Sequence, residues 1–232
     1  ATITLFLLRL PTKSHATWYL ITFFALVACS GAASILANAI FFWDRLFIPW
    51  QDFWIVAAGA TLSQFAYSFP TFERSKEARR VLILMSSLTL VAFLYCAVFD
   101  LRFLFFWSSE LDVSEAFYLL LPIGTATVIL IFLRRSVYYS RLTMSEKLPV
   151  EEVGVWQHLI HPKGRYAHAL RNMALALSLA FLPGLQTIVH WPNPYGFVLS
   201  NIGALLAICI LALVYFSYAP ESSSFMFKLV GI

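Results

Sequence analysis

The sequence predicts an all-α fold, a polytopic bundle of transmembrane helices in which residues 1–232 form a single integral membrane domain. Of the 232 residues, 60% are hydrophobic and only 12% are charged, about half of the charged share that soluble domains carry. Six apolar stretches approach the length of about 20 residues that a membrane-spanning helix requires. Basic residues gather in alternate connections between these stretches, as they do in membrane proteins.

The six apolar stretches are predicted to be complete spans. They cover residues 18–41, 53–69, 81–99, 117–133, 169–189 and 195–218. The second and fourth are short, so flanking residues are expected to complete them. Only the fifth contains a charged residue, Arg171 in its first turn. The apolar ends, 1–10 and 225–232, are expected to be partial spans that belong to further helices.

The distribution of charge predicts the orientation of these spans. Fourteen of the sixteen Lys and Arg residues fall on one side, and the other side receives only Arg45 and Arg102. Because cytoplasmic connections are rich in Lys and Arg, the N-terminal tail, the 70–80 loop and the 134–168 loop are predicted to be cytoplasmic. The predicted location is the cell membrane, either a plasma membrane or a bacterial inner membrane.

The 134–168 loop is the longest polar interval, and it predicts a short amphipathic helix. Its apolar stripe consists of Val150, Val153, Trp156, Leu159 and Ile160. Such a helix lies on a membrane surface or docks on a partner domain, and the sequence leaves both open. The residues expected to couple this loop to the spans are Arg141, Trp156, His158, His161, Arg165 and Arg171.

The connections on the other side are short and rich in aromatic residues. Tryptophan at this depth is typical of an aromatic belt at the lipid headgroups. The alternative is an apolar, outward-facing ligand pocket with aromatic walls. The residues that would line that pocket are Trp43, Trp54, Trp107, Trp191, Gln186 and Asn201.

Several functional classes are disfavoured. No ionisable residue lies in the middle of a complete span, which argues against a proton-coupled pump or transporter. No nucleophile elbow, P-loop or HExxH motif is present, so the visible chain is not expected to be an enzyme. His158 and His161 lack a carboxylate or thiol partner in sequence, so neither a metal nor a cofactor is expected. The basic balance fits cytoplasmic loops, and no nucleic-acid partner is predicted.

The short outer connections, the basic segment GRYAHALRNMAL and the turn YAPESSSFMFKLVGI resemble the multi-helix N-terminal sensor regions of bacterial membrane histidine kinases and adenylate or guanylate cyclases. That resemblance implies a module that relays an outer or intramembrane signal to a cytoplasmic effector domain. Two alternatives stay open: a non-catalytic membrane subunit of a larger complex, and a facilitative transporter of a neutral substrate. The expected partners are the lipid bilayer, an effector domain or partner subunit, and a second copy in a homodimer.

Overall fold

A computed structural model describes most of the chain. The described residues are 2–9, 13–39, 44–70, 75–106, 114–145, 154–188 and 194–218. Within these ranges the chain is helical and contains no strand, so the predicted all-α class is confirmed. The helices are α1 (Thr2–Leu8), α2 (His15–Ala39), α3 (Asp44–Ser68), α4 (Lys76–Phe106), α5 (Ser114–Ser145), α6 (Val155–Ile160), α7 (Arg165–Ile188) and α8 (Pro194–Tyr218).

Each of the six apolar stretches overlaps one long helix, and three of them, 81–99, 117–133 and 195–218, lie entirely within α4, α5 and α8. All six helices begin before the stretch that they overlap. In α3 the helix begins at Asp44 and continues through Pro49, a region that the sequence predicts as a connection. In α5 it continues from the apolar stretch to Ser145. Apolar content predicts where a helix meets lipid, but backbone hydrogen bonding continues into polar residues with good helix propensity. Two segments, His15–Leu36 and Lys76–Val98, are long and apolar enough to cross a membrane by length and composition.

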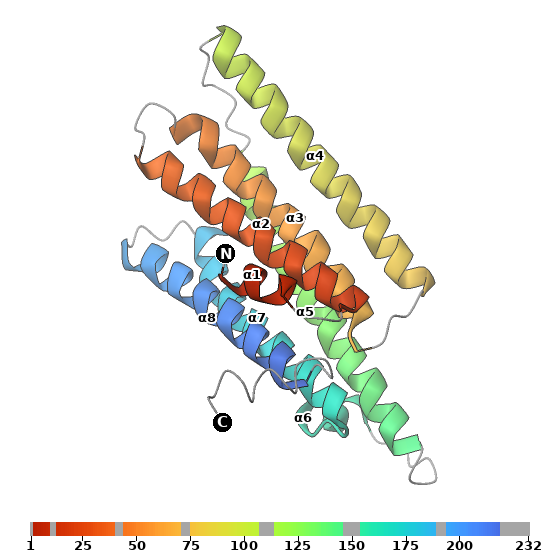
Figure 1. The fold of residues 1–232 in the computed structure, drawn as a ribbon. Helices are drawn as coiled ribbons and strands as arrows, with labels where there is room; N and C mark the ends of the chain where they lie inside the picture. Colours follow the sequence, from red (N-terminus) through yellow and green to blue (C-terminus); the bar gives the residue numbers. More distant parts are fainter. Residues whose placement is uncertain are drawn as a thin grey trace. The chain divides into compact units, whose positions relative to one another are not determined.

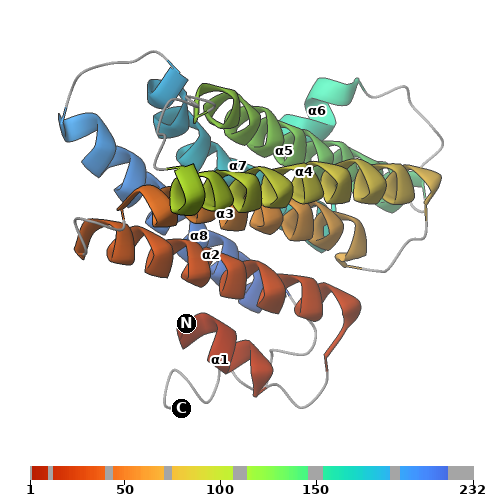
Figure 2. The same cartoon turned by 90° about the horizontal axis from the view of Figure 1, so that it is seen from above.

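The chain forms two compact units, Ala1–Gly124 and Thr125–Ile232, with the boundary inside α5. In the first unit α2 packs along α3, α3 packs along α4, and α1 lies against α2 (Figures 1 and 2). The α3 helix is the most buried of the four, because Ala57, Ala58 and Leu62 place small or slender side chains where helices approach closely. The α4 helix, by contrast, leaves many large apolar side chains exposed. Its exposed large side chains are Leu82, Ile83, Leu84, Leu90, Val91, Phe93, Leu94 and Val98.

Polar side chains in the first unit donate to carbonyl groups of neighbouring helices. The Ser30 hydroxyl of α2 donates to the Gln51 carbonyl of α3 at 3.2 Å. The buried Cys96 thiol of α4 donates to the Pro49 carbonyl of α3, also at 3.2 Å. In an apolar environment, where water is absent, such bonds supply the hydrogen-bond partner that a polar group requires. They fasten α2 and α4 to α3.

In the second unit α7 packs along α8 (Figure 1). The α5 helix joins α7 through the buried Ser136 hydroxyl, which donates to the Ala167 carbonyl at 2.8 Å. The short α6 lies in the polar interval between α5 and α7, and side chains of both helices hold it. This arrangement gathers the end of α5 and the start of α7 around α6 and creates the candidate site.

Candidate functional site

The candidate site is a polar cluster where α5, α6 and the turn before α7 meet. We call it the hub and define it by Ser140, Thr143, His158, Lys163 and Gly164. Its central residue is Ser140, which is completely buried on α5. The Ser140 Oγ lies 2.9 Å from Nδ1 of His158 on α6. It also accepts the backbone N–H of Lys163 at 2.9 Å. One hydroxyl group therefore joins three segments of the chain.

His158 is the inward-facing residue of α6. Only 4% of its surface is exposed, although the rest of this helix is partly or fully exposed. Burial lowers the pKa of His158 from its ordinary value of 6.5, and the positive charges of Arg141 and Lys163 lower it further. Both effects favour the neutral imidazole. In the tautomer that carries its proton on Nε2, Nδ1 accepts the Ser140 O–H while the Ser140 oxygen accepts the Lys163 N–H. The serine hydroxyl is then satisfied both as donor and as acceptor.

Gly164 forms the turn that returns the chain from α6 into α7. Its φ of 99° lies in the left-handed region, where residues other than glycine are strained. A Cβ at this position would also lie 2.6 Å from the Thr143 Oγ1 of α5. The Gly164 carbonyl accepts the His168 N–H at 3.2 Å and so begins the hydrogen bonding of α7. This close approach allows α5 and the start of α7 to share the hub.

Two arginines of α7 extend the contacts of the hub. The Arg171 Nη1 donates to the Ile160 carbonyl at 2.7 Å, which places a cation at the C-terminal end of α6, where the free carbonyls of a helix favour positive charge. The Arg165 Nη2 donates to the Ser217 carbonyl at 3.1 Å, and its guanidinium lies over the Tyr218 ring. The α6 helix is thus held from α5 and from α7, and the start of α7 is held to the end of α8.

A hydrogen-bonded serine and histidine can also form a nucleophile and its base. The hub does not favour that chemistry, because the Ser140 hydroxyl is fully buried and its oxygen already accepts a backbone N–H. No Asp or Glu lies among the residues of 125–232 whose side chains the structure describes. A carboxylate to orient the imidazole is therefore missing from that part. The Ser140–His158 bond positions α6.

The structure describes all six residues that the sequence predicts to couple the loop to the spans. It places three of them, His158, Arg141 and Arg171, in or beside α6. His158 is buried in the hub, Arg141 lies close enough to lower its pKa, and Arg171 and Arg165 donate to carbonyls as described above. Trp156 belongs to the same six-residue helix but points outward, with 74% of its surface exposed.

The sixth residue, His161, is exposed at the C-cap of α6 and does not share the buried side of His158. Among the described residues no group of three His, Cys, Asp or Glu side chains is placed to hold a metal ion. A helix is observed at Val155–Ile160, inside the segment for which the sequence predicts an amphipathic helix. The predicted positions Val150 and Val153 lie outside the described residues.

Of the residues predicted to line an outer pocket, only Trp54 has a described side chain. Trp43, Trp107 and Trp191 lie outside the described residues, and Gln186 and Asn201 are described only as helical backbone in α7 and α8. Trp54 is half-buried in an aromatic cluster between α3 and α4.

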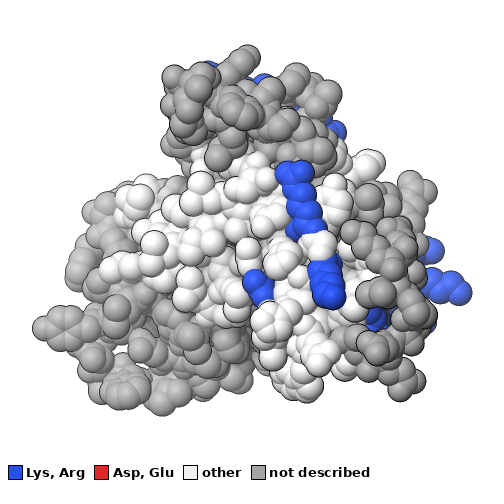
Figure 3. Space-filling model, turned by 90° about the horizontal axis from the view of Figure 1, so that it is seen from below, with Lys and Arg blue, Asp and Glu red and all other residues white. Residues whose placement is uncertain are grey.

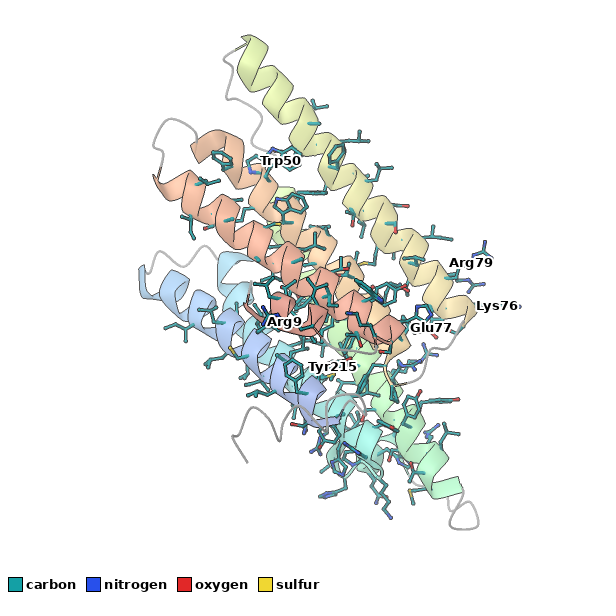
Figure 4. All side chains as sticks on the ribbon, viewed as in Figure 1. Arg9, Trp50, Lys76, Glu77, Arg79 and Tyr215 are labelled. Carbon is teal, nitrogen blue, oxygen red and sulfur yellow. The ribbon has the colours of Figure 1, made fainter. Side chains whose placement is uncertain are left out.

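The centre of this aromatic cluster is Phe53. Its ring centroid lies 4.8 Å from that of Trp54, 5.6 Å from that of Trp50 and 5.8 Å from that of Phe93. Figure 4 shows Trp50 on α3 beside α4, at some distance along α4 from Lys76, Glu77 and Arg79 at its start. The cluster packs two helices together, and the small side chains of α4 at positions 92 and 96 complete its buried part.

Sequence reasoning missed Ser140, Thr143 and Gly164. The segment HPKGR contains the Pro and Gly that mark a turn, and that signal could have placed Gly164 before a helix. Ser140 gives no comparable local signal, because an isolated serine near the end of a helix usually faces solvent or its own backbone. Its role becomes visible only when α6 folds back onto α5.

Comparisons with protein-family models, with curated proteins and with solved structures find no match for this chain. Function therefore has to be inferred from the described residues. Among them, the hub is where side chains from different helices meet in buried hydrogen bonds.

Proposed function

We propose that this chain is a membrane-embedded signal-transducing module with six membrane-spanning helices, and that α6 is the element through which it reports on their packing. Helix length supports the six spans: α2, α3, α4, α5, α7 and α8 have 24 to 32 residues each. A helix rises about 1.5 Å per residue, so each is long enough to cross a hydrocarbon core of about 30 Å. The positive-inside distribution puts the hub on the cytoplasmic side in this proposal.

One observation carries the relay: α6 is fastened to two different long helices. His158 is bonded to Ser140 of α5, and two residues later the Ile160 carbonyl is bonded to Arg171 of α7. When α5 and α7 slide or tilt relative to each other, a six-residue helix whose C-terminal half is bonded to both of them has to shift with them. The outward face of α6 therefore changes with the arrangement of the spans.

The relay is tested with bilayer thickness as the stimulus, because hydrophobic mismatch changes the tilt of membrane helices. Spin labels are attached at Leu142→Cys on α5 and Gln157→Cys on α6, both exposed positions, after the exposed Cys29 and Cys209 are replaced by Ser. The distance between the labels is measured by pulsed electron paramagnetic resonance in bilayers of short-chain and long-chain lipids. We expect the distance to change with thickness.

The Ser140→Ala variant should lose this dependence and show a broader range of distances, because α6 is then released from α5. Ser178→Ala is the matched control, since the Ser178 hydroxyl donates to the Ala174 carbonyl of its own helix. If the distance between the two labels did not change with bilayer thickness in the protein with an unmodified hub, the relay would be disproved. Labelling of single cysteines from either side of the membrane tests the six-span topology independently.

A second candidate function, a non-catalytic subunit of a larger membrane complex, is favoured by the apolar outer face of α4. Eight large apolar side chains of this helix are exposed, which suits contact with lipid or with a helix of another chain. Purification in mild detergent separates the two functions. A stable hetero-complex that dissociates when Ile83 and Leu90 are both replaced by Ala would favour the subunit.

A further inference from the structure

The outward side of α6 presents exposed apolar residues away from the hub. Trp156 is 74% exposed, and Ile160, four residues later on the same side of the helix, is 59% exposed. Val155 is also half exposed. The hub fixes this orientation, because His158 points inward to Ser140. An exposed tryptophan is stabilised most in a lipid headgroup layer. There its ring is partly removed from water while its N–H can still form a hydrogen bond with water.

The charged side chains that the structure describes around α6 have one sign. In the part 125–232, the described Lys and Arg side chains are Arg134, Arg135, Arg141, Lys163, Arg165 and Arg171. No Asp or Glu has a described side chain in that part to neutralise them. In the space-filling view of Figure 3 the coloured charged side chains on the face shown are likewise Lys and Arg. Arg141 lies beside the hub on α5, and Lys163 belongs to the hub itself, in the turn before α7. Both side chains are exposed, and their charges lower the pKa of His158.

The hub also lies at a suitable depth. Ser140 is seven residues beyond Leu133, the end of the apolar stretch in α5, which corresponds to about 10 Å of helix. The headgroup layer on each side of a bilayer is about 5–7 Å deep. Ser140 is therefore about 3–5 Å beyond the outer edge of the headgroup layer, a distance that long Arg and Lys side chains can cover to reach the phosphates.

We propose that the outward side of α6, together with Arg141 and Lys163, is a docking surface for an anionic phospholipid leaflet. The inference rests on the membrane insertion proposed above and names the partner of α6. Trp156 and Ile160 enter the headgroup layer, while the two cations contact lipid phosphates. An anionic surface attracts each nearby Lys or Arg by about 1 kcal/mol, which corresponds to about a fivefold preference per residue.

The first experiment uses a fluorescent probe on α6. An environment-sensitive nitrobenzoxadiazole group is attached at Trp156→Cys in the background that retains only the buried Cys96. The protein is reconstituted in nanodiscs of phosphatidylcholine alone or mixed with phosphatidylglycerol. We expect a blue shift and stronger emission when phosphatidylglycerol is present, and a weaker effect at high salt because screening shortens the reach of the charges. The same probe at Gln157→Cys, which lies about 100° around the helix, should respond less.

The second experiment removes the charges. Arg141→Gln combined with Lys163→Gln should raise the phosphatidylglycerol fraction needed for half of the blue shift, through a loss of about 25-fold in lipid preference. Both side chains are exposed, so folding should be retained, and circular dichroism checks this. The matched control is Arg79→Gln with Arg80→Gln, which removes two exposed charges from α4.

Each outcome decides the inference. Equal losses in the two double variants would show a response to net charge alone and would overturn the assignment to the hub. A probe at position 156 that does not distinguish the two nanodiscs, in protein that is fully inserted, would overturn the lipid surface and leave the six-span relay standing. Failure to enter nanodiscs at all would instead contradict the proposed membrane module.

Discussion

The aromatic cluster between α3 and α4 and the hub between α5, α6 and α7 hold helices together in different ways. In the aromatic cluster, rings of Trp50, Phe53 and Phe93 pack at centroid distances of 5.6 to 5.9 Å, and any side chain of similar volume can supply part of that contact. In the hub, single atoms of Ser140 and His158 meet at 2.9 Å. Packing tolerates changes of chemistry, whereas a buried hydrogen bond does not tolerate the loss of one partner.

The reason lies in the surroundings of each region. In the proposed membrane module the aromatic cluster lies among lipid tails, which are as apolar as the side chains of a span, so helix association in that region depends on shape and close contact. Beyond the apolar stretches water competes for every polar group, and a polar contact is stable only when it is buried and complete. The comparison therefore predicts that the aromatic cluster responds to changes of volume and that the hub responds to changes of hydrogen bonding.

The largest effect is expected for Phe53→Ala, which removes the ring at the centre of the aromatic cluster. Loss of a buried Phe costs about 3–5 kcal/mol in water-soluble cores. We expect the lower end of that range because, in the proposed membrane module, lipid replaces water around α4. Phe53→Leu keeps much of the volume and should cost less than about 1.5 kcal/mol. The free energy of unfolding in mixed micelles measures both. Equal losses would contradict a response governed by volume.

The next largest effect is expected for Ser140→Ala. This change removes few atoms but leaves the His158 imidazole and the Lys163 N–H without their partner. An unsatisfied buried polar group costs about 1–3 kcal/mol, so a loss of about 2 kcal/mol is expected in unfolding experiments. Ser178→Ala should change stability much less. If both serines behaved alike, the hub would not be a special contact.

A smaller effect is expected for Gly164→Ala. A left-handed backbone costs a residue with a Cβ about 1–2 kcal/mol, and Thr143 must move to avoid the new methyl group. Gly154→Ala is the control, because Gly154 has a φ of −58° and open space around it. Thermal unfolding of the two variants should differ clearly. Adding Thr143→Ala to Gly164→Ala should recover the part of the loss caused by the clash.

The smallest effect is expected from pH. The folded pKa of His158 is lowered, so the unfolded chain binds a proton at a higher pH than the folded chain does. The contribution of His158 to stability is therefore complete above the ordinary value of 6.5 and is lost as the pH falls through the lower, folded pKa. A protonated Nδ1 can no longer accept the Ser140 O–H, and the new charge faces Arg141 and Lys163.

Hydrogen exchange measures this effect at the backbone N–H of His161, which bonds to the Gln157 carbonyl at 2.8 Å and reports on the end of α6. Beyond the ordinary dependence of exchange on pH, its protection should decrease below pH 6.5 in the unmodified chain. His158→Gln, which retains a hydrogen-bonding side chain without titrating, should remove that decrease. Protection that falls identically in both proteins would assign the pH response to another group.

The helices could be predicted from sequence because their signal is local. Each of the six apolar stretches contains enough consecutive hydrophobic residues to predict a helix without knowledge of its neighbours. Their ends were predicted less well: α3 begins nine residues before the stretch at 53, since helical hydrogen bonding continues where hydrophobicity stops. Within the polar interval, the composition indicated the helix around Trp156 but not which of its sides would be buried.

What the sequence by itself determined is the all-α class, the positions of the long helices and the excess of cations in the 134–168 interval. All of these depend on residue types that lie next to one another along the chain. Only the tertiary structure decided that His158 faces Ser140, 18 residues earlier, and that Gly164 lies against Thr143. A hydrogen bond depends on the positions of two atoms to within tenths of an ångström, and those positions are set by how α5, α6 and α7 fold onto one another.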